Sequence, residues 1–415
     1  MYPLRFLMCL LLFGIAPCAF AQGEAIKETF NDRQIQRSLN FLDQNRDQYT
    51  NWLIDIGQII SPSGQEHKRA RAVADIMKKI GLQNVRVNEM PNAIGTLPGK
   101  SDRCIVLVST LDDLAGVAEN QRNTNKAPYV EGNKLIGPGT NTSSITVAML
   151  AAAEAMIESG QTPDHTLVFA AVAQEETGLK GMRHLFDEYK DKAVVFVDIL
   201  GDGRSISYGA LGIHWWKVIA TGPPGHTLRG GMPNQPNVNQ GIGRAVDRIL
   251  QLPQPMLHED LRTRINVGMI QSGNVFNHKP DTGFFSLDIR SMQEGIIQDI
   301  ESDVQEILLD VSRETKVKLE LEAFQTMQAG QIEGFRESPQ VQTAIAVSNF
   351  LGYEPNLSNS GSSNMNVAIS QGVPAIGLGG GRGGQRGFAD EWADIDAMMR
   401  AAKHVFLYVN ALEID

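Results

Sequence analysis

The hydrophobic and polar positions alternate along most of the chain between short apolar runs and longer stretches with helical periodicity. Apolar runs such as Cys104–Ser109 (CIVLVS) are typical of strands buried on both faces of a parallel sheet. Ser144–Ser159, in contrast, carries the pattern of a helix. The first half therefore predicts an α/β fold, a mostly parallel sheet sandwiched by helices. Helices are expected at 34–57, 66–80, 144–159 and 179–189, and strands at 85–87, 93–96, 104–109, 166–173 and 193–197.

The order of elements changes near residue 210. A strand at 213–222, a helix at 239–251, strands at 262–270 and 284–290, a helix at 292–315 and a strand at 317–324 form a βαββαβ series, which is a ferredoxin-like unit. The first pattern then returns, with helices at 338–351 and 393–412 and a strand at 374–378. We therefore expect a larger α/β domain in two parts, 22–209 and 326–415, with a smaller domain at 210–325 inserted between them.

The first 21 residues have the pattern of a signal peptide. Arg5 precedes an apolar run that ends in Ala19-Phe20-Ala21, a small-x-small cleavage signal. A membrane anchor is the weaker alternative, because the run is shorter than the ~20 residues that span a bilayer. We expect export to the periplasm or secretion, and no membrane contact after cleavage. Cys104 would then be the only cysteine, so no internal disulfide can form.

Composition narrows the possible functions. The chain has 415 residues, of which 42% are hydrophobic, enough for a large buried core and against disorder. It carries 37 basic and 47 acidic residues, a formal charge of −10, and has no basic tract. We therefore expect no nucleic-acid partner, because such binding depends on neutralising phosphates with basic side chains.

Acidic residues follow three of the predicted buried strands. Asp112 comes after the first, Glu175 and Glu176 after the second, and Asp198 ends the third. The carboxyl ends of parallel strands meet at one edge of a sheet, so these acids should converge. Each could merely cap the next helix, but converging carboxylates repel one another unless a cation or a proton neutralises them.

These acids belong to a series of motifs. The series consists of Asn92–Gly99 (NAIGTLPG), Gly137–Asn141 (GPGTN), Gln174–Gly178 (QEETG), Gly222–His226 (GPPGH), Asp288–Arg290 (DIR) and Asp390–Trp392 (DEW). In this order, and with the inserted βαββαβ unit, the chain resembles the M20 family of metallopeptidases over nearly all of its length after residue 21. The resemblance implies a lid domain that often builds a homodimer, and two zinc ions that activate water and polarise the scissile carbonyl.

The resemblance also implies a role for individual residues. Glu175 corresponds to the general base and Asp112 to a second catalytic residue, whereas Glu176 and Asp198 correspond to metal ligands. The expected substrate contacts are His226, Asn277, Arg290 and Asn366.

The sequence departs from the family pattern at three ligand positions. Thr110 replaces the first histidine, Thr142 the bridging aspartate and Gly387 the last histidine. Zinc sites of about four ligands are worth roughly 10–16 kcal/mol in peptides, so the loss of three ligands should abolish the pair of ions. We expect the other histidines, such as His165 and His184, to have surface or packing roles. The sequence thus predicts that the ancestral zinc is lost and that catalysis is impaired.

Three functions remain open. The first is a non-catalytic protein that binds a peptide or an N-acyl amino acid through the lid residues and Asn366. The second is a hydrolase of peptide or amide bonds, with Glu175 as base and Mg²⁺, Ca²⁺ or Mn²⁺ held by oxygen ligands. Those ligands would be Asp112, Thr110, Thr142, Glu176 and Asp198. The third is a structural or regulatory role through a lid-mediated homodimer. The glycine-rich segment Gly377–Gly387 is interpreted as the remainder of the last ligand motif, or alternatively as a loop that contacts substrate.

Overall fold

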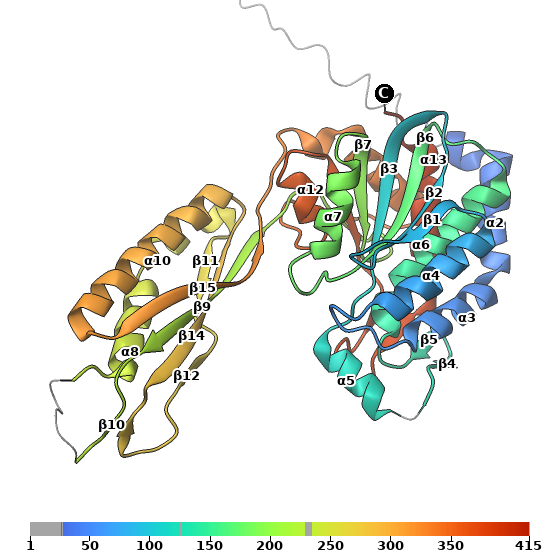
Figure 1. Ribbon diagram of the computed structural model, residues 1–415. Helices are drawn as coiled ribbons and strands as arrows, with labels where there is room; N and C mark the ends of the chain where they lie inside the picture. Colours follow the sequence, from blue (N-terminus) through green and yellow to red (C-terminus); the bar gives the residue numbers. More distant parts are fainter. Residues whose placement is uncertain (1–25, 27, 125, 229–234, 415) are drawn as a thin grey trace, which may run out of the picture.

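The computed structural model describes residues 26, 28–124, 126–228 and 235–414, so the predicted signal peptide lies outside the described residues. Figure 1 shows a larger α/β body and a smaller unit that extends from it. We call residues 212–327, from the first to the last of the strands in the smaller unit, the lid.

The body contains a mixed sheet. Among the described residues, its eight strands have the order β1-β2-β6-β3-β7-β17-β8-β16. The central strands β6, β3, β7 and β17 run parallel, whereas β1 and β2 pair antiparallel at one edge and β8 pairs antiparallel with β17. The strands are β1 Gln83–Val87, β2 Ala93–Leu97, β3 Ser101–Thr110, β6 His165–Val172, β7 Ala193–Ile199, β8 Ser205–Ser207, β16 Asn356–Ser358 and β17 Ala375–Gly379. The predicted α/β sandwich is confirmed.

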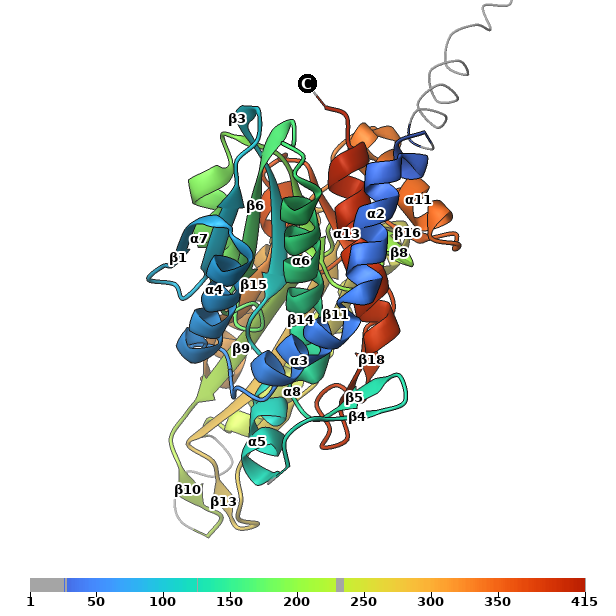
Figure 2. The same cartoon turned by 90° about the vertical axis from the view of Figure 1, so that its right-hand side faces the viewer.

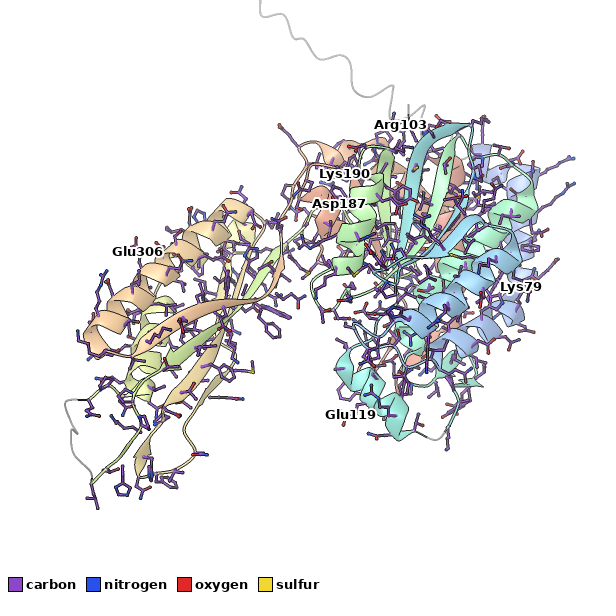
Figure 3. All side chains as sticks on the ribbon, viewed as in Figure 1. Lys79, Arg103, Glu119, Asp187, Lys190 and Glu306 are labelled. Carbon is purple, nitrogen blue, oxygen red and sulfur yellow. The ribbon has the colours of Figure 1, made fainter. Side chains whose placement is uncertain are left out.

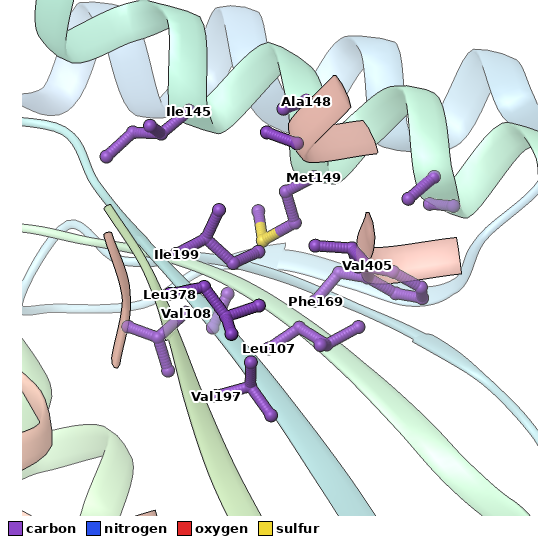
Figure 4. Close-up of a cluster of buried hydrophobic side chains, with 14 of the residues drawn as sticks. Leu107, Val108, Ile145, Ala148, Met149, Phe169, Val197, Ile199, Leu378 and Val405 are labelled. Atoms are coloured by element: carbon purple, nitrogen blue, oxygen red, sulfur yellow. The ribbon is translucent and has the colours of Figure 1, made fainter. Parts of the chain in front are cut away.

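Helices cover both faces of this sheet (Figures 1 and 2). α6 and α13 cover one face, with α2 and α3 packed outside α6, and α7 and α12 cover the other. Met149 of α6 and Val405 of α13 meet the strand residues Leu107, Phe169 and Val197 in a buried core (Figure 4). The helices of the body are α2 Arg33–Gln44, α3 Arg46–Gly57, α4 His67–Ile80, α5 Ala115–Asn123, α6 Thr140–Ser159, α7 Lys180–Tyr189, α11 Pro339–Phe350, α12 Met365–Ile369 and α13 Ile395–Ala411.

The body also contains a second, smaller sheet next to the eight-stranded sheet. It has the order β18-β19-β5-β4 and joins the loop after β17 to the segment before α6. Its strands are β4 Tyr129–Glu131, β5 Lys134–Ile136, β18 Gly383–Gly384 and β19 Trp392–Asp394. The pairing of β19 with β5 is important for function, because it holds the glycine-rich segment against the amino end of α6.

The lid has its own sheet and its own core. Its strands have the order β11-β14-β9-β15, and β12 also pairs with β14. The helices α8 and α10 cover one face of this sheet (Figure 1). Val218, Phe285 and Ile297 are fully buried in this second core. The elements of the lid are β9 Gly212–Thr221, β10 Gly225–His226, α8 Val238–Ile249, α9 Gln254–Leu257, β11 Arg264–Asn266, β12 Ile270–Ser272, β13 His278–Lys279, β14 Thr282–Ser291, α10 Glu294–Thr315 and β15 Lys318–Met327.

Most predicted elements are shifted by one to three residues at their ends, and three differ in a way that has a physical reason. The helix expected at 34–57 is divided at Asn45, whose φ of −99° and ψ of 14° interrupt the helix. The helix expected from Ser144 begins four residues earlier, because the hydroxyls of Ser143 and Ser144 donate to carbonyls of the preceding turn. The strand expected at 262–270 is two short strands, β11 and β12, on the same neighbour.

The surface of both units is charged. Figure 3 shows Lys79, Glu119 and Glu306 on the outer sides of three helices, where all three are exposed. Within the described ranges, no helix is both long and apolar enough to cross a bilayer.

Candidate functional site

The site lies at the carboxyl ends of the parallel strands. Thr110 ends β3, Glu175 follows β6, and Arg382 follows β17. Together with Thr142 at the start of α6 and Arg386, these residues line a cavity of about 310 Å³. Of the four acids that the sequence predicted to converge, Glu175 lines this cavity, and Glu176, Asp112 and Asp198 lie close enough for their charges to raise its pKa. The structure adds two arginines to this group.

The paired glutamates are held by a strained turn. Gln174 has a φ of 55°, in the left-handed region that non-glycine residues rarely adopt. This conformation directs the N–H groups of Glu175 and Glu176 at the carboxylate of Asp112, at 2.9 and 3.1 Å. The hydroxyl of Ser63 donates to the same carboxylate. Asp112 is fully buried, so its oxygens hold the glutamate turn in place.

Asp198 is likewise engaged within the chain. One of its oxygens accepts from the backbone N–H of Met365 at 3.2 Å, and the other lies 3.4 Å from the side-chain amide nitrogen of Asn364. The same amide group donates to the hydroxyl of Thr110 at 3.2 Å. Burial raises the pKa of Asp198 to about 6, although the hydrogen bonds counteract this effect. Both oxygens of Asp198 therefore already have hydrogen-bond donors within the chain.

Two arginines lie next to the acids of this cavity, and one of them is paired with an acid. Arg386 forms an ion pair with the carboxylate of Glu176. Arg382 lies next to Arg386. Burial, and then the charge of Arg386, lower the pKa of Arg382 to about 10. The pKa of Glu175 is raised well above its ordinary value by burial and then by the charges of Glu176, Asp112 and Asp198. Glu175 therefore favours the protonated form, in which it repels its acidic neighbours less.

Gly387 cannot easily accommodate the missing imidazole. Its φ of 92° is strained for any residue with a side chain, even though the space around it is open. Its N–H donates to the buried carboxylate of Glu391 at 3.1 Å. The other oxygen of Glu391 accepts from the N–H groups of Gly139 and Asn141, at 2.9 and 3.2 Å. The last motif thus connects the glycine-rich segment to the amino end of α6.

The residues present do not fit the pair of zinc ions that the resemblance implies. Zinc needs about four nitrogen, sulfur or carboxylate ligands with free lone pairs. Here Asp112 and Asp198 accept hydrogen bonds from N–H groups, and Glu176 is paired with a guanidinium. Across the part of the chain that the structure describes, no group of three or more His, Cys, Asp or Glu residues is arranged to hold a metal ion.

No histidine lines this cavity or the larger one next to it. His165 contacts the hydroxyl of Ser101 and the carbonyl of Ile414 at the opposite end of the sheet. His184 contacts Asn88 on the outside of the body. His404 is buried against Ser348, and burial lowers its pKa to about 4. These side chains have packing and surface roles.

The expected substrate contacts lie in three separate places. His226 and Asn277 contact each other at 3.1 Å. His226 belongs to β10, which lies at the tip of the lid, away from the body (Figure 1). Arg290 is held by Asp288 at 3.0 Å on the same strand. Asn366 is buried, and its amide nitrogen donates to the carbonyls of Leu211 and Gln328 at 2.8 and 3.1 Å. Asn366 therefore connects the two segments that lead into and out of the lid.

Arg382 and Arg386 were missed by the sequence prediction. The available signal was two arginines in a glycine-rich segment at the place where the family supplies its last ligand. Comparison with the family motif shows that a histidine is absent at Gly387, but it does not show that a nearby arginine supplies positive charge.

Comparison with known proteins agrees with this architecture. The family model described as peptidase family M20/M25/M40 matches residues 113–411. The chain is 23% identical over 363 residues to a [LysW]-lysine/[LysW]-ornithine hydrolase of Sulfurisphaera tokodaii, covering 87% of this chain and 94% of that protein. It is 24% identical over 269 residues to a succinyl-diaminopimelate desuccinylase of Corynebacterium glutamicum, covering 63% and 70%.

Solved structures show the same fold. The aminopeptidase PepT of Bacillus cereus has a TM-score of 0.72 at 17% identity, covering 89% of this chain and 99% of that one. An M20 family metallo-carboxypeptidase of Sulfolobus solfataricus has a TM-score of 0.71 at 14% identity, covering 88% and 99%. At these identities the likeness establishes the fold alone.

Proposed function

The chain belongs to the peptidase family M20/M25/M40, and from this premise we propose that it is an exported, zinc-free member that binds a peptide or an N-acyl amino acid without hydrolysing it. The observation that carries this proposal is the ion pair between Arg386 and Glu176 in the cavity where the family motifs converge. Guanidinium groups replace divalent cations as the positive charges next to the acids.

The physical argument concerns which partner the carboxylates prefer. An arginine is permanently charged and remains covalently attached, so Glu176 always has a cation next to it. For zinc to bind, it would have to displace that guanidinium and break the hydrogen bonds on Asp112 and Asp198. Zinc sites use about four strong ligands, and no imidazole lies in this cavity. The few bonds that zinc could form here would therefore not compensate for the interactions that it must break.

A cleft suitable for a ligand is retained. Next to the 310 Å³ cavity lies a larger one of about 590 Å³, bounded by Ile213, Trp215 and Met327 of the lid and by Leu114 of the body. A volume of this size is in the usual range for small-molecule sites. The cleft is therefore large enough to bind a small ligand even though three metal ligands of the family are absent.

The competing function is a hydrolase that uses Glu175 as base and a hard cation. It requires open oxygen ligands, whereas the oxygens of Asp112 and Asp198 already accept hydrogen bonds. Glu176, the remaining acid next to Glu175, is already paired with the guanidinium of Arg386. These observations favour the binding function.

The deciding experiment is an activity assay on the protein without residues 1–21. Di- and tripeptides and N-acetyl amino acids are incubated with Zn²⁺, Co²⁺, Mn²⁺, Mg²⁺ or Ca²⁺, and a Glu175→Gln variant serves as the background. We expect no turnover above that background. Turnover with any ion that disappears in Glu175→Gln would favour the hydrolase.

Two further features belong to the proposal. We propose export to the periplasm or secretion on the basis of the pattern of residues 1–21, and amino-terminal sequencing of the protein from cell fractions tests it.

We also propose a homodimer through the lid, because His226 and Asn277 lie together at its tip, away from the cavity of their own chain. Light scattering after size-exclusion chromatography gives the molar mass that tests the dimer.

A further inference from the structure

The two arginines of the cavity have unused hydrogen-bond donors. In the described residues, the guanidinium of Arg382 makes no hydrogen bond and no ion pair within 4 Å, although it lines the cavity. The Nε atom of Arg386 is buried and has no hydrogen-bond partner, although another nitrogen of the same group is paired with Glu176. The guanidinium of Arg382 therefore presents N–H donors at the cavity that no described acceptor of the chain satisfies, and Arg386 next to it has an unsatisfied buried donor.

Such an arrangement is costly without an occupant. A guanidinium does not lose its proton in proteins, and it offers five donors and no acceptor. Burying one without a partner costs more than burying a neutral polar group, and here two of them repel each other. An anion bound between Arg382 and Arg386 would satisfy the free donors and reduce that repulsion.

The surroundings select the kind of anion. Glu176 and Asp198 bring negative charge close to the cavity, so a doubly charged group such as phosphate would meet more repulsion than a singly charged one. A carboxylate is planar and matches the two parallel N–H groups of a guanidinium.

We propose that Arg382 and Arg386 bind the carboxylate of a linear ligand, either a short peptide or an N-acyl amino acid, whose apolar part extends along Trp215. The smaller and the larger cavity share Glu175, Ser362 and Arg386, so one ligand can occupy both. The larger cavity supplies the apolar surface of Leu114, Ile213, Trp215 and Met327. This inference rests on the proposed binding function and identifies the group that the site recognises.

The assignment differs from the expectation for the lid residues. Arg290 was a predicted contact to the ligand, but its guanidinium is already held by Asp288. Asn366 is likewise used to connect the segments that lead to the lid. Among the described residues that line the two cavities, Arg382 and Arg386 are the basic ones.

The test compares matched ligands that differ in one charge. Isothermal titration calorimetry measures hippurate (N-benzoylglycine) against its neutral amide, hippuramide, and trialanine against trialanine amide. We expect at least one of the two carboxylates to bind saturably, and its amide to bind at least ~10-fold more weakly, because a charge-assisted pair is lost. The first pair represents N-acyl amino acids and the second represents peptides, so the stronger arm identifies the source of the carboxylate.

Variants locate the binding group. Arg382→Gln should weaken binding at least ~10-fold, and Arg382→Lys should lie between it and the natural protein, because it keeps the charge without the planar group. Arg336→Gln, at an exposed arginine outside the two cavities, is the matched control and should change nothing. Thermal unfolding of each variant shows whether it is folded, and the comparison of acid with amide needs no variant.

The outcomes separate the two proposals. Equal binding of acid and amide, unchanged affinity in Arg382→Gln, or no saturable binding of either carboxylate would overturn the assignment of the arginines. Cleavage of hippurate to benzoate and glycine would overturn the non-hydrolytic function, whereas preferential binding of the acid together with cleavage would leave the carboxylate assignment standing.

Discussion

The guanidinium of Arg386 lies against the carboxylate of Glu176, 210 positions away in the chain. Glu176 follows the strand β6, and Arg386 belongs to the glycine-rich segment after β17. The contact connects two loops at the rim of the sheet and provides the positive charge that an acidic cavity needs.

Removal of that charge should destabilise the fold. Arg386→Gln leaves Glu176 next to Glu175 and Asp198 without a paired cation, and we expect a loss of about 1–3 kcal/mol in the free energy of unfolding. Arg386→Lys keeps the charge and should lose less. Urea unfolding followed by circular dichroism measures both values, and an unchanged stability of Arg386→Gln would mean that the ion pair contributes nothing.

Glu175→Gln should have the opposite effect. Burial and three neighbouring acids raise the pKa of Glu175, so its charge is unfavourable in the folded state. A neutral side chain of the same shape removes that cost, and we expect a higher free energy of unfolding at pH 8 for Glu175→Gln than for the natural protein. Thermal and urea unfolding test it. A less stable Glu175→Gln would indicate that the charged carboxylate makes a favourable contact.

The buried ion pair beneath the cavity is a separate structural requirement. Arg69 contacts Asp113 at 2.6 Å, and both side chains are almost completely shielded from solvent. Arg69→Met removes one partner, which should cost about 3–5 kcal/mol because Asp113 keeps an unpaired buried charge. The double variant Arg69→Met with Asp113→Leu should recover part of this loss. Equal stability of the single variant and the natural protein in urea would contradict this interpretation.

The lid should lose stability at alkaline pH. His214 lies between Glu294 and Glu301, at 3.2 and 2.6 Å. Burial lowers the pKa of His214, but the hydrogen bonds and charges of these two glutamates outweigh it and raise the pKa to about 9. The pKa is therefore higher in the folded state than the ~6.5 of an unfolded chain. The stabilisation is complete below pH ~6.5 and is lost as the pH rises through about 9.

A variant isolates this contribution. The free energy of unfolding should differ between the natural protein and His214→Gln by about 3 kcal/mol at pH 6. The difference should become small at pH 10, where the imidazole is neutral. A difference that stays constant between the two pH values would show that His214 does not titrate in this range.

Much of this fold could be predicted from local patterns, and the site could be predicted in part. Runs such as Cys104–Ser109 identify buried strands, and the acids after them mark the rim because parallel strands end together. The start of α6 at Thr140 could not be predicted from the sequence, because the hydroxyls of Ser143 and Ser144 are satisfied there by the carbonyls of Gly139 and Asn141.

The roles of the retained acids depend on long-range contacts. Asp112 matches a catalytic motif in the sequence, but in the fold it accepts the N–H groups of Glu175 and Glu176. The partner of Glu176 lies more than half the chain away, and no local pattern predicts that contact. The sequence could therefore identify the positions that depart from the family motif, but not the arginine that pairs with Glu176.

The proposed replacement of metal ions by guanidinium groups is tested most directly by the zinc content of the protein. The protein without residues 1–21 is dialysed to equilibrium against micromolar zinc, and its metal is then measured by elemental analysis. A variant with Thr110→His, Thr142→Asp and Arg386→Gln is the matched control and should retain more zinc, because it regains two ligands and loses the competing charge. We predict far less than one zinc ion per natural chain, whereas two tightly bound zinc ions per chain would contradict the replacement.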